Sequence, residues 1–242
     1  MSTTLFTALA ADWPLLGAPP NEAQTAQFAA YAALIVEWNQ RINLTAIDDA
    51  EGIATRHFLD SLSVLGGVEN DNEITTVIDV GSGAGFPGIP LAILRPTWQL
   101  TLLEATRKKV DFLNLALREL ALDNVQTVWG RAEEMAQQPA HREHYDLAVA
   151  RAVASLPVLA EFCLPFVRVG GYWVAQKGPK ADEELGQSAN ALGQLGGKLR
   201  KVETITIPGL EEATRTLVVV DKVRVTPGTF PRRPGTPSKR PL

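Results

Sequence analysis

Residues 75–88 read Thr-Thr-Val-Ile-Asp-Val-Gly-Ser-Gly-Ala-Gly-Phe-Pro-Gly, a β-branched apolar run followed by four glycines within eight residues. The run predicts a buried strand that ends at Val80, and the glycines predict a turn whose backbone a ligand can approach closely. Pro87 suits a first helical turn, where a missing N–H costs nothing. Residues 89–94 continue as an apolar helical face until Arg95-Pro96. A strand, a glycine turn and a helix form the start of a βαβ unit.

The glycines allow two interpretations of the turn. Residues 83–88 fit the G-x-G-x-x-G pattern of dinucleotide sites. Because the predicted strand ends at Val80, however, Gly81 is the natural first glycine, and Phe86 then stands where the third dinucleotide glycine belongs. The spacing from Gly81, G-x-G-x-G, is typical of the nucleoside-binding loop of S-adenosylmethionine (SAM) methyltransferases. The loop alone leaves a dinucleotide, SAM and a turn without a ligand open.

Size and composition indicate a soluble α/β protein. The 242 residues suffice for one such domain with an extension, and 45% hydrophobic with 21% charged residues is ordinary for a globular chain. No apolar run approaches the ~18 residues of a membrane helix, and no secretory signal is visible. Cys163, the one cysteine, lies in an apolar run. It excludes an internal disulfide and fits a buried thiol in a reducing cytoplasm.

Charge is distributed unevenly along the chain. The net charge is −4, but residues 1–76 carry ten acids and two bases, whereas residues 222–242 carry six Lys/Arg and no acid. This asymmetry permits a phosphate-rich partner near the C-terminus. A solvated basic tail explains it equally well.

The region before the glycine turn is predicted to be helical. Asn21 is a suitable N-cap for apolar residues at helical spacing up to Trp38, and a second helix is expected to begin near Asp48. Residues 1–72 are therefore predicted to be a helical extension packed on a core domain, residues 73–225. Residues 226–242 are predicted to be a basic, Pro-rich tail without regular structure.

The core domain shows strands that alternate with helices and then a terminal pair. Alternation predicts a parallel sheet with helices on both faces, and the pair predicts an antiparallel hairpin at its edge. The fold class is thus α/β, a Rossmann-like, mostly parallel seven-stranded sheet of the SAM methyltransferase type with an N-terminal helical extension. The predicted strands cover residues 75–80, 98–103, 125–129, 145–150, 172–176, 199–207 and 214–225.

Ionisable residues stand at or just after the ends of five predicted strands, namely Asp79, Glu104, Glu133, Arg151 and Lys177. In open parallel sheets, ligands bind beyond the carboxyl ends of the strands. Glu104 lies twenty-three residues after Gly81, as expected for an acid that accepts hydrogen bonds from ribose hydroxyls of either NAD or SAM. Asp79 is expected to orient the glycine loop or to lie near a sulfonium.

The step Ala132-Glu133 favours SAM more specifically. Ala132 would stack on the edge of an adenine, and a polar group would face its exocyclic amine; a surface glutamate at a helix start is the alternative. Metal chemistry has little support, because His57, His141 and His144 lack cysteine partners. Neither a G-x-S-x-G elbow nor a Cys–His dyad is present, which disfavours nucleophilic hydrolysis.

Several motifs together resemble one family, the bacterial 16S ribosomal RNA guanine-N7 methyltransferases, also called glucose-inhibited division protein B. The resemblance runs from about residue 25 to the C-terminus, whereas residues 1–20 match nothing. It implies transfer of the SAM methyl group to N7 of one guanine near the decoding centre, and an association with low-level streptomycin resistance. The motifs are residues 38–45, 56–62, 79–88, 151–156 and 231–237.

The resemblance also implies site residues. In the family the cofactor contacts would be Gly81, Phe86, Ala132, Glu133 and Arg151. Gly83 of the glycine loop and Glu104 at the end of the second strand, which the strand and glycine pattern already indicates, complete the predicted cofactor site. Guanine N7 bears a lone pair and no proton, so its methylation needs no general base, and no catalytic acid or base is predicted. Alignment and desolvation are expected to dominate instead.

RNA contacts are predicted at positively charged or polar positions. Arginine suits the O6 and N7 acceptors of guanine. For Arg56 and His57, helix packing and local pairing with Asp60 are the alternative. The partner would be 16S RNA within the small ribosomal subunit or an assembly intermediate, and nothing in the sequence indicates a dimer. The predicted RNA contacts are Arg56, His57, Lys177, Arg232 and Arg233.

Two other functions stay open at this point. An NAD(P)-dependent oxidoreductase would bind NADH and not SAM. A ribosome-binding protein that keeps the fold without the activity would associate with the particle and transfer no methyl group.

Overall fold

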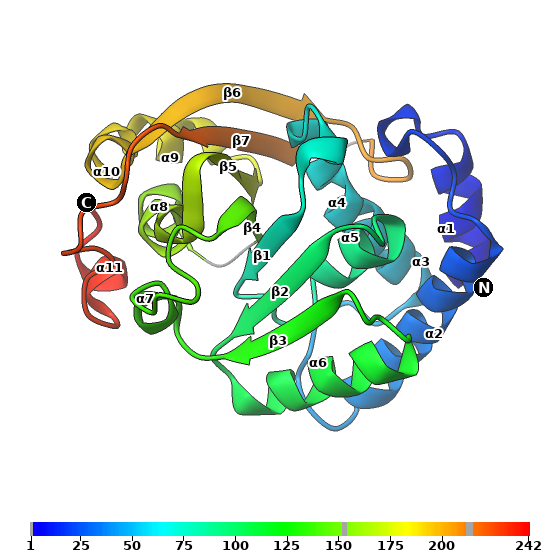
Figure 1. Ribbon diagram of the computed structural model, residues 1–242. Helices are drawn as coiled ribbons and strands as arrows, with labels where there is room; N and C mark the ends of the chain where they lie inside the picture. The colour runs from blue at the N-terminus through cyan, green and yellow to red at the C-terminus, as the bar shows by residue number, and fades with distance from the viewer. Residues whose placement is uncertain (1, 152–153, 212–214) are drawn as a thin grey trace.

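A twisted sheet of seven strands runs through the middle of the molecule (Figure 1). The computed structural model describes residues 2–151, 154–211 and 215–242. The strands are β1 (Thr76–Val80), β2 (Gln99–Glu104), β3 (Val125–Trp129), β4 (Tyr145–Arg151), β5 (Val167–Lys177), β6 (Gly197–Ile205) and β7 (Arg215–Lys222). Their order in space is β3-β2-β1-β4-β5-β7-β6.

The strand directions confirm the predicted fold class. The five strands β1 to β5 are parallel, and β7 pairs antiparallel with both β5 and β6. The order runs outward from β1 to β3 on one side and from β4 on the other, so β1 and β4 flank the point where it reverses. Such a point opens a crevice beyond the carboxyl ends of the strands.

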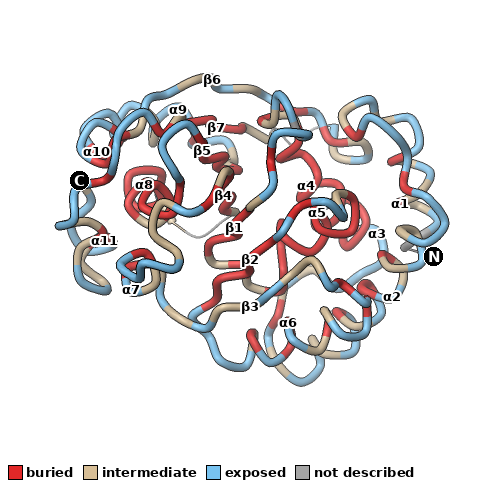
Figure 2. Tube along the Cα trace, viewed as in Figure 1, coloured by how far each residue is buried: buried red, intermediate tan, exposed pale blue. Residues whose placement is uncertain are grey.

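Both faces of the sheet are buried. Successive residues of a strand point to opposite faces, and in the central strands most residues on both sides are apolar. Val77 of β1 joins one core with Phe28 and Phe112, whereas Ile78 and Val80 join a second core on the other face. Figure 2 shows buried residues concentrated on the central strands and on the helices beside them.

Each core is covered by its own helices (Figure 1). The first face carries α1 (Ser2–Ala11), α2 (Glu22–Asn39), α3 (Ala50–Gly52), α4 (Asp60–Leu62), α5 (Gly88–Leu94) and α6 (Arg107–Glu119). The second carries α7 (Ala132–Met135), α8 (Leu156–Cys163), α9 (Ala181–Gly186) and α10 (Ala189–Leu195). Short 3₁₀ turns at Pro14–Leu16, Ser63–Gly67, Asp71–Glu73 and Leu164–Phe166 link these elements.

The N-terminal helices share the core of the first face and are tied to it by hydrogen bonds. Asn21 caps α2 through a capping box with Gln24, as the N-cap prediction required. The Gln24 side chain donates to Ile93 O of α5 at 2.9 Å, and Gln27 donates to Leu120 O beyond α6 at 2.8 Å. The segment after α2 reaches the carboxyl ends of the parallel strands.

Local structure differs in detail from two predictions. The helix expected near Asp48 begins at Ala50 with Asp49 as N-cap, but it is not a regular α-helix: α3 is followed by a π-helical segment Ile53–Leu59, α4 and a 3₁₀ turn. Between β5 and β6 the chain forms two helices, α9 and α10, which Gln187 and Ser188 separate. The strand expected at residues 172–176 begins earlier, at Val167, beyond a bulge opposite β4.

Residues 226–242 were predicted to lack regular structure, and this prediction was wrong for part of the tail. It forms α11 (Thr236–Lys239) and lies beside α7 and α8 (Figure 1). The Arg142 guanidinium donates to four backbone carbonyls, among them those of Thr226, Pro227 and Phe230. These bonds form because the segment has few backbone partners of its own. Within the described ranges no helix is long and apolar enough to cross a membrane.

Candidate functional site

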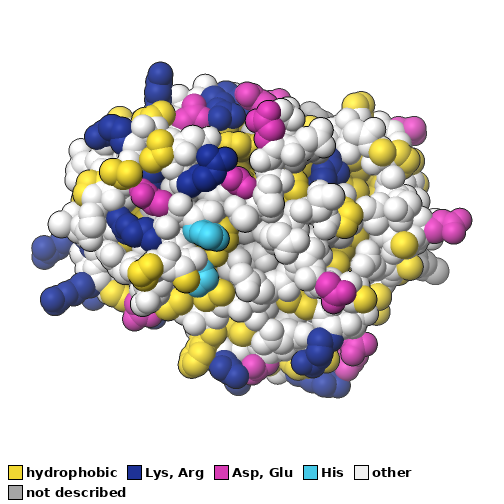
Figure 3. Space-filling view, viewed as in Figure 1, with side chains coloured by type: hydrophobic (Ala, Val, Ile, Leu, Met, Phe, Trp, Pro, Cys, Tyr) yellow, Lys and Arg dark blue, Asp and Glu magenta, His cyan; other side chains and the backbone are white. Residues whose placement is uncertain are grey.

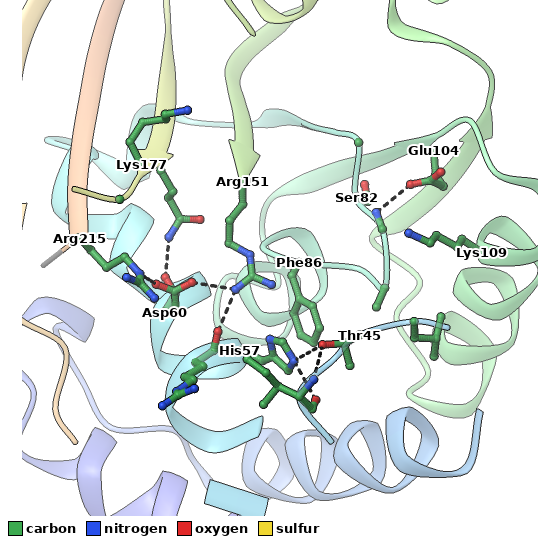
Figure 4. A pocket seen from close by; sticks show the side chains of 18 of the residues that line it. Thr45, His57, Asp60, Ser82, Phe86, Glu104, Lys109, Arg151, Lys177 and Arg215 are labelled. Carbon is green, nitrogen blue, oxygen red and sulfur yellow. Dashed lines mark hydrogen bonds and ion pairs between the residues drawn. The ribbon is translucent and has the colours of Figure 1, made fainter. Parts of the chain in front are cut away.

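A cavity of about 900 Å³ opens at the carboxyl ends of the parallel strands. Figure 4 shows its two ends: Glu104 and Lys109 lie on one side, and Asp60, Arg151, Lys177 and Arg215 on the other. The glycine loop and Phe86 lie between them. Of the predicted site residues, the cavity is lined by Gly81, Gly83, Phe86, Glu104, Arg151, Arg56, His57 and Lys177.

The glycine loop has the conformation that its composition predicts. Gly81, Gly83 and Gly85 have φ of 79°, 61° and 98°, where side chains are strained. Gly81 N and Ser82 N both donate to Leu103 O of β2, so the turn starts directly after β1. This supports Gly81, rather than Gly83, as the first glycine of the motif.

Glu104 ends β2 with a largely buried carboxylate that holds the loop. Its Oε2 accepts a hydrogen bond from Gly83 N at 2.9 Å, and its Oε1 accepts one from Thr106 N at 2.7 Å. A carboxylate offers about four acceptor positions, so two stay available for hydroxyl donors. The arrangement therefore fits the predicted ribose site.

Asp79 lies under the loop rather than in the cavity wall. Its side chain is fully buried, Oδ2 accepts from Gly88 N at 2.9 Å, and Oδ1 has no hydrogen-bond partner among the described residues. Burial raises the pKa of the Asp79 carboxyl to about 7. Of the two predicted roles, orienting the loop is the one that these contacts support.

The raised pKa of Asp79 makes the stability of the protein depend on pH. Unfolding restores a pKa near 3.8. Between that pH and about 7 the folded state retains a proton that the unfolded state releases, so ionisation costs stability as the pH rises. We expect Asp79→Asn to gain stability relative to the wild type, by up to about 4 kcal/mol, between pH 4 and pH 8. Denaturant unfolding of both proteins across this range measures it; a difference independent of pH would contradict it.

Asp60 joins two arginines at the far end of the cavity. Arg151 Nη1 donates to Asp60 Oδ2 at 2.8 Å and to Arg56 O at 3.0 Å, and Arg215 Nε donates to Asp60 Oδ1. The Asp60 side chain is only 6% exposed. The alternative of local pairing between Arg56 and Asp60 was therefore wrong: Asp60 pairs with residues of β4 and β7, and Arg56 contributes its carbonyl.

Phe86 lies between a histidine and an arginine. The His57 ring is stacked on it with centroids 4.5 Å apart and planes at 15°, and the Arg151 guanidinium lies 4.9 Å from the Phe86 ring centre. Burial, followed by the charge of Arg151, lowers the pKa of His57 to about 4. His57 is neutral at pH 7, so it lines the cavity without a charge for phosphate.

Lys177 lies at the end of β5 with its amine engaged. The Nζ atom pairs with Glu184 Oε2 at 2.7 Å and donates to Ala154 O at 2.9 Å. Its side chain is 10% exposed. Lys177 thus borders the cavity, but a ligand phosphate would have to compete with Glu184.

The remaining predicted residues lie outside the cavity lining and belong to the contact with the tail. Glu133 Oε1 accepts from Gly235 N at 2.9 Å, and Ala132 precedes it in α7. Arg232 pairs with Glu161 Oε2 at 2.6 Å, where the Glu161 side chain is 1% exposed, whereas Arg233 is exposed. Cys163 is buried, as predicted.

The pair of Arg232 with Glu161 should stabilise the folded tail. Removing the arginine leaves a buried carboxylate without its counter-ion, which costs about 3 kcal/mol. We therefore expect Arg232→Gln to lower the unfolding free energy by that amount, and Arg233→Gln, which removes the same charge from the surface, to change it little. Thermal unfolding of both variants tests this. Equal effects would show that charge alone, and not the ion pair, matters.

Among the cavity residues that sequence reasoning missed, Asp60, Gln176 and Arg215 form one hydrogen-bonded group. Asp60 accepts from both arginines, and Gln176 Nε2 donates to Asp60 O at 2.6 Å. Arg215 could have been found from topology: β7 runs antiparallel to β5, so its first residues lie beside Lys177, as the pairing of Lys177 with Thr216 shows. Asp60 lies in the motif of residues 56–62, but nothing in that motif indicated that it pairs with Arg151 and Arg215.

Comparison with known proteins finds one family and a common fold. The family model described as "rRNA small subunit methyltransferase G" matches residues 24–217. A protein of that name from Alkaliphilus metalliredigens is 50% identical over 94% of this chain and 94% of its own. The one from Deinococcus deserti is 51% identical over 89% and 88%. TrmN from Thermus thermophilus shares the fold, with a TM-score of 0.51 at 15% identity over 70% of this chain and 53% of that chain.

Proposed function

The chain belongs to the family of rRNA small subunit methyltransferase G, and from this premise we propose that it methylates N7 of one guanine in 16S ribosomal RNA, near the decoding centre, with SAM as methyl donor. The observation that carries the proposal is the cavity at the carboxyl ends of β1, β2 and β4. It combines an open glycine loop, an acid with spare acceptor positions and a cluster of arginines.

The residues of the cavity fit a nucleoside with an attached cation. Glu104 would accept hydrogen bonds from two ribose hydroxyls, and Gly81 and Gly83 leave the backbone open to the ligand. SAM supplies a methyl group made electrophilic by its sulfonium. Phe86 lies between the two ends of the cavity and would border that group, and the Arg151 guanidinium reaches its ring from the end that holds Asp60. Contacts of Ala132 and Glu133 with the adenine stay a proposal from family resemblance.

The end formed by Asp60, Arg151 and Arg215 would receive the guanine. Arginine donors match the O6 acceptor of the purine, and Asp60 holds both guanidinium groups in place. N7 needs no general base because it carries no proton. The chain's contribution is thus alignment of the two reactants and exclusion of water. Arg56, His57 and Lys177 border this end. Of the two tail arginines predicted to contact RNA, Arg233 is the exposed one and would be available to RNA phosphates.

We propose the small ribosomal subunit or an assembly intermediate as the substrate and the cytoplasm as the location, with the protein acting as a monomer. Loss of the modification would then give low-level streptomycin resistance. In this view residues 1–72 are an extension that shapes the cavity rim, residues 73–225 form the catalytic domain, and residues 226–242 are a tail docked on it.

The test is methyl transfer from labelled SAM to small-subunit particles from a strain that lacks the modification, with the modified base mapped. We expect one labelled guanine, methylated at N7. Labelling of another atom or base would overturn the specific proposal. Binding to the particle without transfer would favour the non-catalytic alternative, and binding of NADH instead of SAM would favour the oxidoreductase.

A further inference from the structure

An exposed tryptophan lies at the rim of the cavity, and the proposed function gives it no role. Trp129, the last residue of β3, is 56% exposed. It is the one aromatic side chain among the large exposed hydrophobic residues of the described ranges. Leaving an indole in water forgoes much of its burial energy, so an exposed tryptophan beside a binding cavity points to a ligand.

The indole is held in a fixed orientation. Its Nε1 donates to Ala105 O at 3.0 Å, and the guanidinium of Arg107 lies 4.9 Å from the ring centre. Arg107 is held in turn by Asp111, with 3.1 Å between Nε and Oδ1. A ring fixed on its edge and by a stacked cation loses little freedom when a further planar group binds.

The position of this ring links it to the cavity and to positive charge. Ala105 and Lys109 line the cavity. Arg107 and Lys108 begin α6, which packs beside β3, and Arg131 follows Trp129 by two residues; all three cations are exposed. Figure 3 shows Lys and Arg side chains, mixed with acidic ones, over the region of β3 and α6. Cations around an exposed planar ring are the features that bind single-stranded nucleic acid.

We propose that Trp129 and Arg107 form a stacking platform for an unpaired base of the RNA substrate, a nucleotide that flanks the target guanine, while Lys108 and Arg131 attract its phosphates. Unstacked bases are recognised in RNA by aromatic rings and arginine planes. The platform lies next to the Glu104 end of the cavity, so the RNA would pass over the cofactor's ribose before the guanine enters. This inference rests on the proposed function.

The experiment measures three variants with particles that lack the modification. Trp129→Ala should raise the KM for the particle about tenfold, because stacking of one base is lost. Trp129→Phe should recover most of that loss, and Arg107→Gln should fall between them. Arg118→Gln, which removes a charge from the exposed far end of the same helix, is the matched control and should leave the KM within about twofold.

The affinity for SAM separates the two possible ligands of the ring. In all variants the Kd for SAM, measured by calorimetry, should stay within about twofold of the wild type. An equal rise in the SAM Kd and in the particle KM would show that Trp129 contacts the adenine instead, and an unchanged KM would show that it binds no RNA base. Either result overturns the platform.

The wild type distinguishes failure of this inference from failure of the proposed function. If the wild type transfers no methyl group, a filter-binding assay still measures the affinity of the wild type and of Trp129→Ala for the particle. Weaker binding of the variant would support the platform without the chemistry. Equal binding would reject it.

Discussion

Glu104→Ala is expected to weaken SAM binding about a thousandfold, an effect of about 4 kcal/mol. The variant loses the acceptors for two ribose hydroxyls. It also leaves Gly83 N and Thr106 N without the carboxylate that now accepts their hydrogen bonds at 2.9 and 2.7 Å. The loop is then held less firmly, which adds to the loss. Isothermal titration calorimetry with SAM measures the change directly.

Glu134→Ala is the matched control for Glu104. It removes one negative charge from an exposed position at the start of α7 and should bind SAM like the wild type. Thermal unfolding of Glu104→Ala without ligand shows whether the loop has collapsed. An unchanged SAM affinity in a folded Glu104→Ala variant would place the ribose elsewhere.

Asp60→Asn is expected to lower kcat for methyl transfer about a hundredfold, close to 3 kcal/mol. The amide keeps the shape of the side chain but no longer neutralises the Arg151 and Arg215 guanidinium groups, whose donors now meet its two carboxylate oxygens. Both arginines would leave the positions in which they face the guanine. Because Asp60 lies at the end of the cavity opposite Glu104, the Kd for SAM should change far less than kcat.

Asp146→Asn serves as the control for a general loss of stability. Asp146 also pairs with an arginine, Arg168, and accepts from Thr75 N and Thr76 N at the start of β1, but it does not line the cavity. We expect this variant to be less stable yet to retain kcat below its unfolding temperature. If both variants lose kcat equally, the effect of Asp60 is structural and the proposed role in positioning arginines is wrong.

The pattern of strands and glycines was enough to predict the sheet and one edge of it. Apolar runs that alternate with amphipathic helices require parallel strands, and the carboxyl ends of parallel strands meet on the same side. For this reason Glu104, Arg151 and Lys177 could be placed around the glycine loop although many residues separate them, and the structure finds all three in one cavity.

The tail shows where such reasoning stopped. Its basic composition predicted a free segment that could meet RNA, and nothing local in the sequence pairs Arg232 with Glu161 or Gly235 with Glu133. The structure makes both contacts, at 2.6 and 2.9 Å, across 71 and 102 residues of chain. The attraction between Glu161 and Arg232 is weak in water and becomes strong only when packing removes the water between them.

The sequence by itself determined the fold class, the first glycine of the loop and the acid that follows β2. Each of these depends on the local sequence, through the spacing of apolar residues and the backbone conformations that glycine allows. Tertiary structure alone decided that Asp60 pairs with both Arg151 and Arg215, of which Arg215 lies 155 residues after Asp60. It also decided that Trp129 remains exposed at the cavity rim. Such contacts depend on which surfaces meet when the N-terminal helices and the terminal hairpin pack on the sheet, and no local pattern encodes that meeting.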